Sequence, residues 1–151
     1  IKSKDDINVT GIPSQKLNGT GAVFLIDSGK TGSTAPMVSI FMEKMKTEGF
    51  RKMISTQFIK HTNLCVDSFL NGDVKNLFDN TKKLSKIVLD NFKPMIPDEF
   101  HDLWKKGIDS GSYFLKLCGS GGGGYILGFA PNIEQAKNDL KDYNLEVVYH
   151  F

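Results

Sequence analysis

The sequence predicts an α+β fold, and three features of its residue pattern lead to this class. Continuous apolar runs typical of strands occur at residues 22–27 and again after residue 112. Between them, apolar residues recur at spacings of three and four, which indicates amphipathic helices. Of the 151 residues, 40% are hydrophobic and 24% are charged, which is the composition of an ordinary globular domain with its own core.

The first strong strand is expected at residues 22–27, where the apolar run suits a strand covered on both faces. It is expected to stop at Ser28 and Gly29. A shorter strand is expected around Ile7 and Val9, which alternate with polar residues and precede a turn-rich connector.

Four helices are expected to follow, at residues 34–49, 51–70, 74–92 and 98–108. Ser33 or Thr34 is a suitable N-cap for the first helix, with Pro36 in its first turn, and Gly49 is expected to end it. Asp73 is the expected cap of the third helix. Prolines separate the third helix from the shorter fourth one.

The pattern then changes to short elements, expected as a strand at 112–118, a strand at 125–129, a helix from Asn132 and a strand at 145–149. Without three of the four helices, the order is βαββαβ, the ferredoxin-like split βαβ arrangement. We therefore expect a four-stranded antiparallel sheet with helices on one face. The additional helices make the first crossover an enlarged one.

Composition excludes several classes of function. Lys and Arg number 19 and Asp and Glu number 17, and this near balance argues against nucleic acid as a partner, which would require a basic stripe. No apolar run approaches the roughly 18 residues of a membrane span, so no membrane partner is expected. Cys65 and Cys118 are too few for a disulfide scaffold and lack metal-ligand spacing. We expect a cytoplasmic location and no metal site in this chain.

A glycine run is the strongest functional signal in the chain. Five of the six residues 119–124 are glycine, and the run lies directly between two expected strands. One explanation is a loop whose backbone amides hold an anion such as phosphate. The other is a flexible hairpin turn. The run is not a Walker A loop, because no Gly-Lys-Ser/Thr closes it, and a strand rather than a helix follows it.

Two stretches resemble a known family. Residues 116–124, KLCGSGGGG, resemble the third signature motif of the GHMP small-molecule kinases, typically KLTGAGGGG. Cys118 stands where Thr or Ser is usual, and Ser120 stands where Ala is usual. Residues 25–34, LIDSGKTGST, resemble the DTGxxGxT stretch that begins the C-terminal domain of mevalonate kinases.

The resemblance implies the C-terminal domain of an ATP-dependent, mevalonate kinase-like enzyme of isoprenoid biosynthesis, which transfers the γ-phosphate of ATP to a small alcohol. Residues 22–151 would be this domain, and residues 1–21 would be the tail and connector of an N-terminal domain. In the family, that domain carries the ATP loop and the catalytic Asp and Lys, and mainly holds ATP and Mg²⁺. We expect this chain alone to be inactive, with its own N-terminal kinase domain as its partner.

The resemblance also assigns roles to residues. The nucleotide phosphates would be bound by Gly119, Ser120, Gly121, Gly122 and Gly123, and the substrate by Ser33 and Thr34. Thr34 lies at an expected helix N-terminus, where amides and the helix dipole favour an anion. Lys30 could reach a phosphate or be solvated. No residue of this chain is expected to be catalytic.

Other hypotheses stay open. A stand-alone ferredoxin-like regulatory domain of the ACT type, which binds a small anion, would explain the sheet and the loop but not both motifs. A structural domain whose glycine loop is only a turn is a third. Within the kinase hypothesis, the acceptor could be mevalonate, phosphomevalonate, homoserine or a sugar, and a related decarboxylase is also open. The apolar face for the N-terminal domain would also allow a homodimer.

Overall fold

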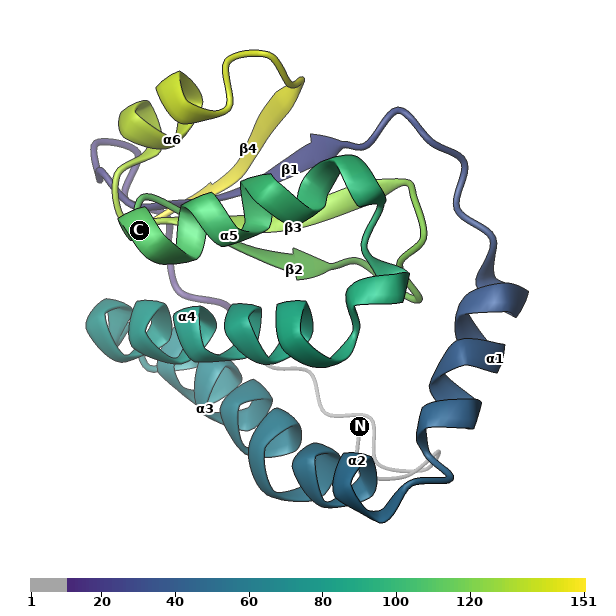
Figure 1. Cartoon of the computed structure of the whole chain (residues 1–151). Coiled ribbons are helices and arrows are strands. Elements are labelled where there is room, and N and C mark those ends of the chain that lie inside the picture. The colour runs from purple at the N-terminus through teal and green to yellow at the C-terminus, as the bar shows by residue number, and fades with distance from the viewer. Residues whose placement is uncertain (1–10) are drawn as a thin grey trace.

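The computed structural model describes residues 11–151, so the short strand predicted around Ile7 and Val9 lies outside the described residues. The strands are β1 (Ala22–Asp27), β2 (Phe114–Leu117), β3 (Tyr125–Ala130) and β4 (Leu145–His150). The helices are α1 (Thr34–Lys44), α2 (Glu48–Met53), α3 (Ile59–Leu70), α4 (Val74–Asn91), α5 (His101–Ser110) and α6 (Ile133–Asp139) (Figure 1). Within the described residues, no helix has the length and apolarity to cross a membrane.

The four strands form one antiparallel sheet in the order β2-β3-β1-β4. β1 and β2 both pair antiparallel with β3, so they run parallel to each other with β3 between them. In the same way, β3 and β4 flank β1. The predicted α+β class and the four-stranded antiparallel sheet are confirmed.

The prediction that Gly49 ends the first helix is wrong. α1 ends at Lys44, and Gly49 lies inside α2. The break comes at Thr47, whose backbone is extended, and the Arg51 guanidinium donates to the carbonyl oxygens of Met45 and Lys46 at 2.8 and 2.9 Å. Arg51 thus donates to carbonyls that would accept backbone amides if the helix continued.

The predicted helix at 51–70 is in fact three helical segments. It begins earlier, at Glu48, and a π-helical segment at Ile54–Phe58 joins α2 to α3. The predicted strand at 112–118 is shorter, at 114–117, and the predicted helix at 98–108 begins with a 3₁₀ turn and ends at Ser110. Asp73 caps α4 as predicted, because its carboxylate accepts from the Asn76 amide at 3.2 Å.

The main core lies between one face of the sheet and helices α5 and α6 (Figure 1), and buried residues of α2 and α4 extend it. Phe24 and Ile26 of β1 point into it, together with Trp104 and Phe100, and all four are fully buried. α3 and α4 lie against the second face and the β2 edge. Helices are therefore not confined to one face, because the long crossover from β1 to β2 carries enough of them to reach the other side.

A β-bulge changes which residues of β4 face the core. Val23 of β1 pairs with Tyr149, whereas the next residue, Phe24, pairs with Val147, so Val148 is an extra residue in the ladder. Without the bulge, Val147 and Tyr149 would share a face. Instead, Val147 packs on the core, and Tyr149 lies with Val23 on the second face.

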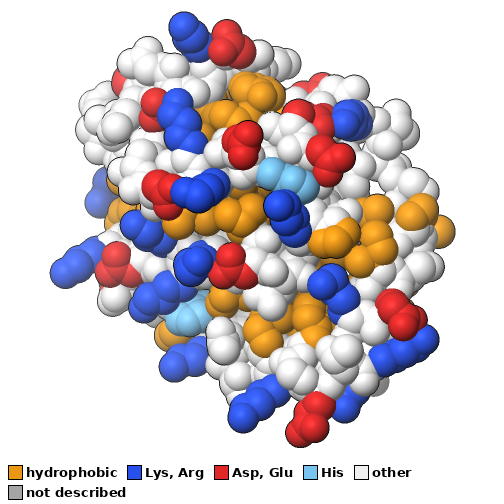
Figure 2. Space-filling view, in the orientation of Figure 1, with side chains coloured by type: hydrophobic (Ala, Val, Ile, Leu, Met, Phe, Trp, Pro, Cys, Tyr) orange, Lys and Arg blue, Asp and Glu red, His pale blue; other side chains and the backbone are white. Residues whose placement is uncertain are grey.

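Charges on the molecular surface are mixed. On the face shown in Figure 2, basic and acidic side chains are interspersed, and apolar side chains form patches between them. Ion pairs between surface residues of the molecule include Lys86–Asp90 on α4, and Lys106 of α5 with Asp139 of α6. Exposed pairs of this kind contribute little to stability individually.

Gly128 is required by the packing of Phe24 across the sheet. A methyl group at Gly128 would lie 2.1 Å from the Phe24 ring. We expect Gly128→Ala to lower the free energy of unfolding by about 1–3 kcal/mol, as overpacked cores do. Gly49→Ala is the matched control, because a methyl there meets no atom within 4 Å and lies in a helix. The control should stabilise by about 0.5–1 kcal/mol in urea unfolding, and equal losses in both variants would contradict this account.

Candidate functional site

The two motif segments, 86 residues apart at their contact, meet in the structure. The Gly124 amide donates to the Lys30 carbonyl at 2.7 Å, and the Ser28 amide donates to the Gly124 carbonyl at 2.9 Å. The Ser120 hydroxyl donates to the Thr34 hydroxyl at 3.4 Å. The glycine loop, residues 119–124, therefore packs along residues 28–34 and reaches the start of α1.

Glycine is needed in the loop for backbone and packing reasons. Gly119, Gly121, Gly122, Gly123 and Gly124 all have positive φ, where side chains are strained. At two of these positions a methyl group would also strike backbone. It would lie 2.5 Å from the Met95 carbonyl oxygen at Gly121, and 2.8 Å from the Gly32 nitrogen at Gly123. The loop is thus packed closely against the backbone of residues 30–32 and of Met95.

Only some amides of the loop can bind an anion. Gly121, Gly122 and Gly124 donate their amides to the carbonyls of Cys118, Met95 and Lys30 at 3.3, 2.7 and 2.7 Å. In the part of the chain that is described, the amides of Gly119, Ser120 and Gly123 donate to no protein acceptor. Of the residues 119–123 predicted to bind phosphate, Gly121 and Gly122 therefore use their amides within the protein.

The N-terminus of α1 is open beside the loop. Ser33 occupies the N-cap position with extended backbone, but its side chain makes no capping hydrogen bond, and the first turn holds no acidic residue. The amides of Thr34 and Ala35 have no partner within the helix, and the helix dipole adds partial positive charge there. Thr34 contacts the loop through Ser120, whereas Ser33 caps the helix by position only.

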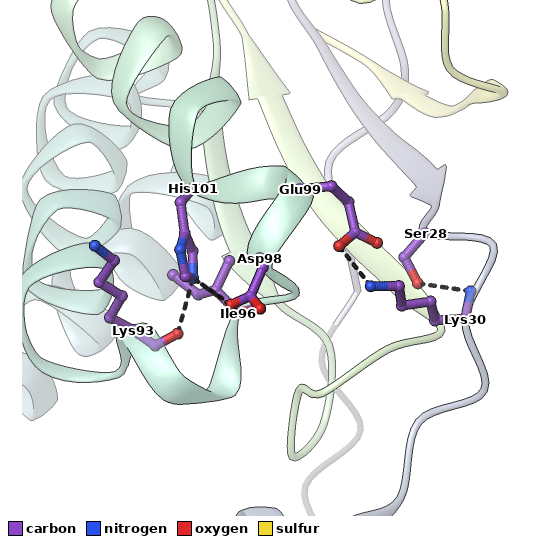
Figure 3. Close-up of polar contacts among 7 residues, drawn as sticks. All are labelled: Ser28, Lys30, Lys93, Ile96, Asp98, Glu99 and His101. Atoms are coloured by element: carbon purple, nitrogen blue, oxygen red, sulfur yellow. Dashed lines mark hydrogen bonds and ion pairs between the residues drawn. The ribbon is translucent and has the colours of Figure 1, made fainter.

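Lys30 is ion-paired rather than free. Its ammonium lies 2.6 Å from the Glu99 carboxylate, which links the β1–α1 connection to the turn before α5 (Figure 3). This hydrogen bond holds the pKa of the Glu99 carboxyl below its usual value. Lys30 was expected either to reach a phosphate or to be solvated, and in this conformation its ammonium instead pairs with Glu99.

A second segment holds the loop from the other side. His101 Nε2 lies 3.1 Å from the carbonyl oxygens of both Lys93 and Ile96 and stabilises the turn between α4 and α5 (Figure 3). That turn includes Met95, whose carbonyl accepts the Gly122 amide. No local sequence pattern connects residues 93–101 to the glycine run, so this support could not be predicted from the sequence.

Removal of the Lys30–Glu99 ion pair should change stability in a pH-dependent way. The pKa of Glu99 is lowered in the folded protein. The ion pair therefore stabilises the folded state fully at pH values above the usual Glu pKa of 4.5, and this stabilisation is lost as the pH falls through the lowered pKa. We expect Glu99→Gln to reduce the free energy of unfolding at pH 7 by about 0.2–1 kcal/mol, as for exposed pairs. In thermal unfolding, the difference in stability between the wild type and Glu99→Gln should disappear below about pH 4. A difference that is constant with pH would contradict this assignment.

A small apolar cavity of about 200 Å³ adjoins the loop. Gly119 and Leu117 form its side nearest the loop, and the rings of Phe41, Phe58 and Phe92 form much of the rest, with Lys116 also in the lining. The aromatic residues come from α1, the π-helical segment and the end of α4, and Phe58 and Phe92 are 5.2 Å apart between ring centroids. The site therefore combines amide donors with an apolar neighbour.

No family model and no curated protein matches this chain. Among residues 11–151, no group of three or more His, Cys, Asp or Glu side chains could hold a metal ion. A function is therefore inferred from the geometry of the loop and α1 together with the two motifs.

Proposed function

We propose that this chain is the C-terminal domain of a GHMP-type, mevalonate kinase-like enzyme that transfers the γ-phosphate of ATP to a small alcohol. The observation that carries this proposal is the contact between Ser120 and Thr34, at 3.4 Å. It joins the two motif segments in one place, where several amides of the loop and of α1 have no acceptor among residues 11–151. A turn without function would not require both segments to meet at an open helix N-terminus.

The topology supports the proposal. The order β2-β3-β1-β4, with β3 between β1 and β2 and β1 between β3 and β4, fits a ferredoxin-like split βαβ fold. In this interpretation the first crossover, from β1 to β2, is the enlarged one and carries α1 to α5. The glycine loop then connects β2 to β3, at the strand ends next to the start of α1.

Phosphoryl transfer requires positioning and charge neutralisation more than covalent chemistry, and this chain has groups for both. In the proposal, the amides of Gly119, Ser120 and Gly123 border the nucleotide phosphates. The amides at the start of α1 and the Thr34 hydroxyl hold the acceptor's carboxylate or the phosphate that develops on it. ATP supplies the phosphoryl group. The second domain supplies the ATP loop, the Mg²⁺ ligand, and the catalytic Asp and Lys.

The neighbouring cavity favours one class of acceptor. Three phenylalanine rings line it, and burial of several hydroxyl groups against them without hydrogen bonds would be unfavourable. An alcohol with an apolar part and an acid group, such as mevalonate, fits this combination of cavity and amides better than a sugar does.

The surface of α1 supports a second domain as a partner. α1 has no fully buried residue, although six of its eleven residues are apolar by sequence. Val38 and Met42 are 49% and 59% exposed, on a helix that stands at the side of the molecule (Figure 1). In the proposal, the N-terminal kinase domain covers this helix.

The test is a phosphotransfer assay with two preparations, the full-length polypeptide and this chain alone. Each is incubated with ATP, Mg²⁺ and either mevalonate, phosphomevalonate, homoserine or galactose, and the phosphorylated product is detected by mass spectrometry. We expect product with mevalonate from the full-length protein and none from the chain alone. ATP turnover by the chain alone, or no product from the full-length protein with any acceptor, would contradict the proposal.

A further inference from the structure

A half-open cavity of about 460 Å³ lies between the second face of the sheet and helices α3 and α4. This volume is within the range of about 300–1,000 Å³ typical of pockets that bind small molecules. Val23, Leu127 and Phe129 contribute the sheet side, and Phe69 and Leu84 are among the helix residues opposite. Its lining shares only Lys116 with the 200 Å³ cavity beside the glycine loop, and the proposed kinase function makes no use of the other lining residues.

Most polar groups of the cavity are already engaged within the protein. The hydroxyls of Thr62 and Thr81 donate to helix carbonyls at 2.8 and 2.7 Å, and the Tyr149 hydroxyl donates to the Pro13 carbonyl at 2.8 Å. Cys65 Sγ lies 3.6 Å from Thr81 Oγ1, and burial raises the pKa of this thiol, so it stays neutral. A ligand here therefore meets apolar surface over most of its length.

Lys116 is the exception. It is half-buried on the edge strand β2, lines the cavity, and within the described residues forms no ion pair. Its ammonium has three donors, of which one goes to the Leu117 carbonyl at 3.3 Å. Lys116 pairs with Leu127 across the β2–β3 ladder, so its side chain leaves the sheet on the face that forms the cavity wall. Within residues 11–151, the cavity thus combines an apolar wall with one lysine that has no acidic partner.

We propose that this cavity binds a long-chain carboxylate, with the aliphatic chain against the sheet and the carboxylate on the Lys116 ammonium. An apolar chain gains free energy from burial against Leu127 and Phe129, which the fold leaves partly exposed. A carboxylate accepts a charge-assisted hydrogen bond from the ammonium and balances its charge. A neutral chain would leave the cation without a partner, and a polar ligand would lose its hydrogen bonds to water. This proposal does not rest on the kinase function.

The test measures binding of dodecanoate, below its micelle-forming concentration, to this chain by isothermal titration calorimetry. We expect one saturable site. Lys116→Met keeps the apolar stem and removes the charge, and it should weaken binding about tenfold, which corresponds to about 1.4 kcal/mol. Val66→Trp adds bulk beside the cavity at a residue that is 51% exposed, so it should fold normally and also weaken binding.

Two controls distinguish binding in the cavity from non-specific attraction of the carboxylate to surface lysines. Lys83→Met is the matched variant, because Lys83 is an exposed lysine of α4 outside the cavity lining, and it should bind dodecanoate like the wild type. Dodecanol, the neutral analogue, should bind at least about tenfold more weakly than dodecanoate. No saturable binding, equal weakening by Lys116→Met and Lys83→Met, or equal affinity for dodecanol and dodecanoate would each overturn the proposal. The last comparison uses the wild-type chain and stands even if a variant fails to fold.

Discussion

Gly123→Ala in the full-length protein is expected to reduce kcat/KM for phosphoryl transfer about a hundredfold or more. The added methyl group would lie 2.8 Å from the Gly32 nitrogen and 2.9 Å from the Lys30 carbonyl oxygen, and both are backbone atoms that cannot turn aside. The loop must therefore move away from residues 28–34, which separates Ser120 from Thr34. A displacement of about 1 Å at a positioned reacting group can alone cost about a hundredfold in rate.

Gly124→Ala is the matched control for this experiment. Its φ is also positive, at 71°, but a methyl group there meets no atom within 4 Å. The control carries only the backbone strain of a left-handed residue, about 1–2 kcal/mol, without the collision. Steady-state kinetics and thermal unfolding of both variants separate the two effects. Equal activity in the two variants would mean that the packing of the loop on residues 28–34 does not matter for function.

Trp104→Ala should cause the largest loss of stability of any single truncation considered for this fold. Trp104 is fully buried in the core between α5 and the sheet, and its indole N–H donates to the Ser85 carbonyl at 3.0 Å. Removal of a buried aromatic ring typically lowers the free energy of unfolding by about 3–5 kcal/mol. That loss is a large fraction of the free energy of unfolding of a typical domain, which is about 5–15 kcal/mol.

Trp104→Phe distinguishes the ring from its hydrogen bond. Phe keeps an aromatic ring in the core but removes the indole N–H that donates to the Ser85 carbonyl, so we expect a smaller loss, about 1–3 kcal/mol. Urea unfolding followed by circular dichroism measures both variants. If Trp104→Ala lost no more than Trp104→Phe, the ring would not be the centre of this core.

Local sequence signals predicted the strands and most helices well. The apolar run at residues 22–27 became β1, the central antiparallel partner of β3 and β4, and Asp73 caps α4 through its carboxylate. The break between α1 and α2 had no local signal of that kind. It depends on Arg51, which folds back onto carbonyls five and six residues earlier. Gly49 looked like a helix stop because glycine often is one, but here its φ is not positive.

The site was predictable in its residue types but not in its supports. The glycine run and Thr34 were recognisable from the sequence, whereas the carbonyls that hold the loop belong to Lys30 and Met95, far from it along the chain. These contacts take up the amides of Gly122 and Gly124, and the glycine pattern alone gave no sign of that. The bulge at Val148, which turns Tyr149 toward the second face, had no sequence signal either.

The most direct test of the central claim, that the glycine loop and the start of α1 form one anion-binding surface, is an NMR titration of this chain with pyrophosphate. We predict that the backbone amides of Gly119, Ser120, Gly123, Thr34 and Ala35 shift along one common saturation curve. The backbone amides of Lys82 and Lys83 on α4 would report non-specific attraction of pyrophosphate to exposed lysines. Their chemical shifts should stay unchanged. Shifts confined to such lysines, or separate curves for the loop and for α1, would contradict the claim.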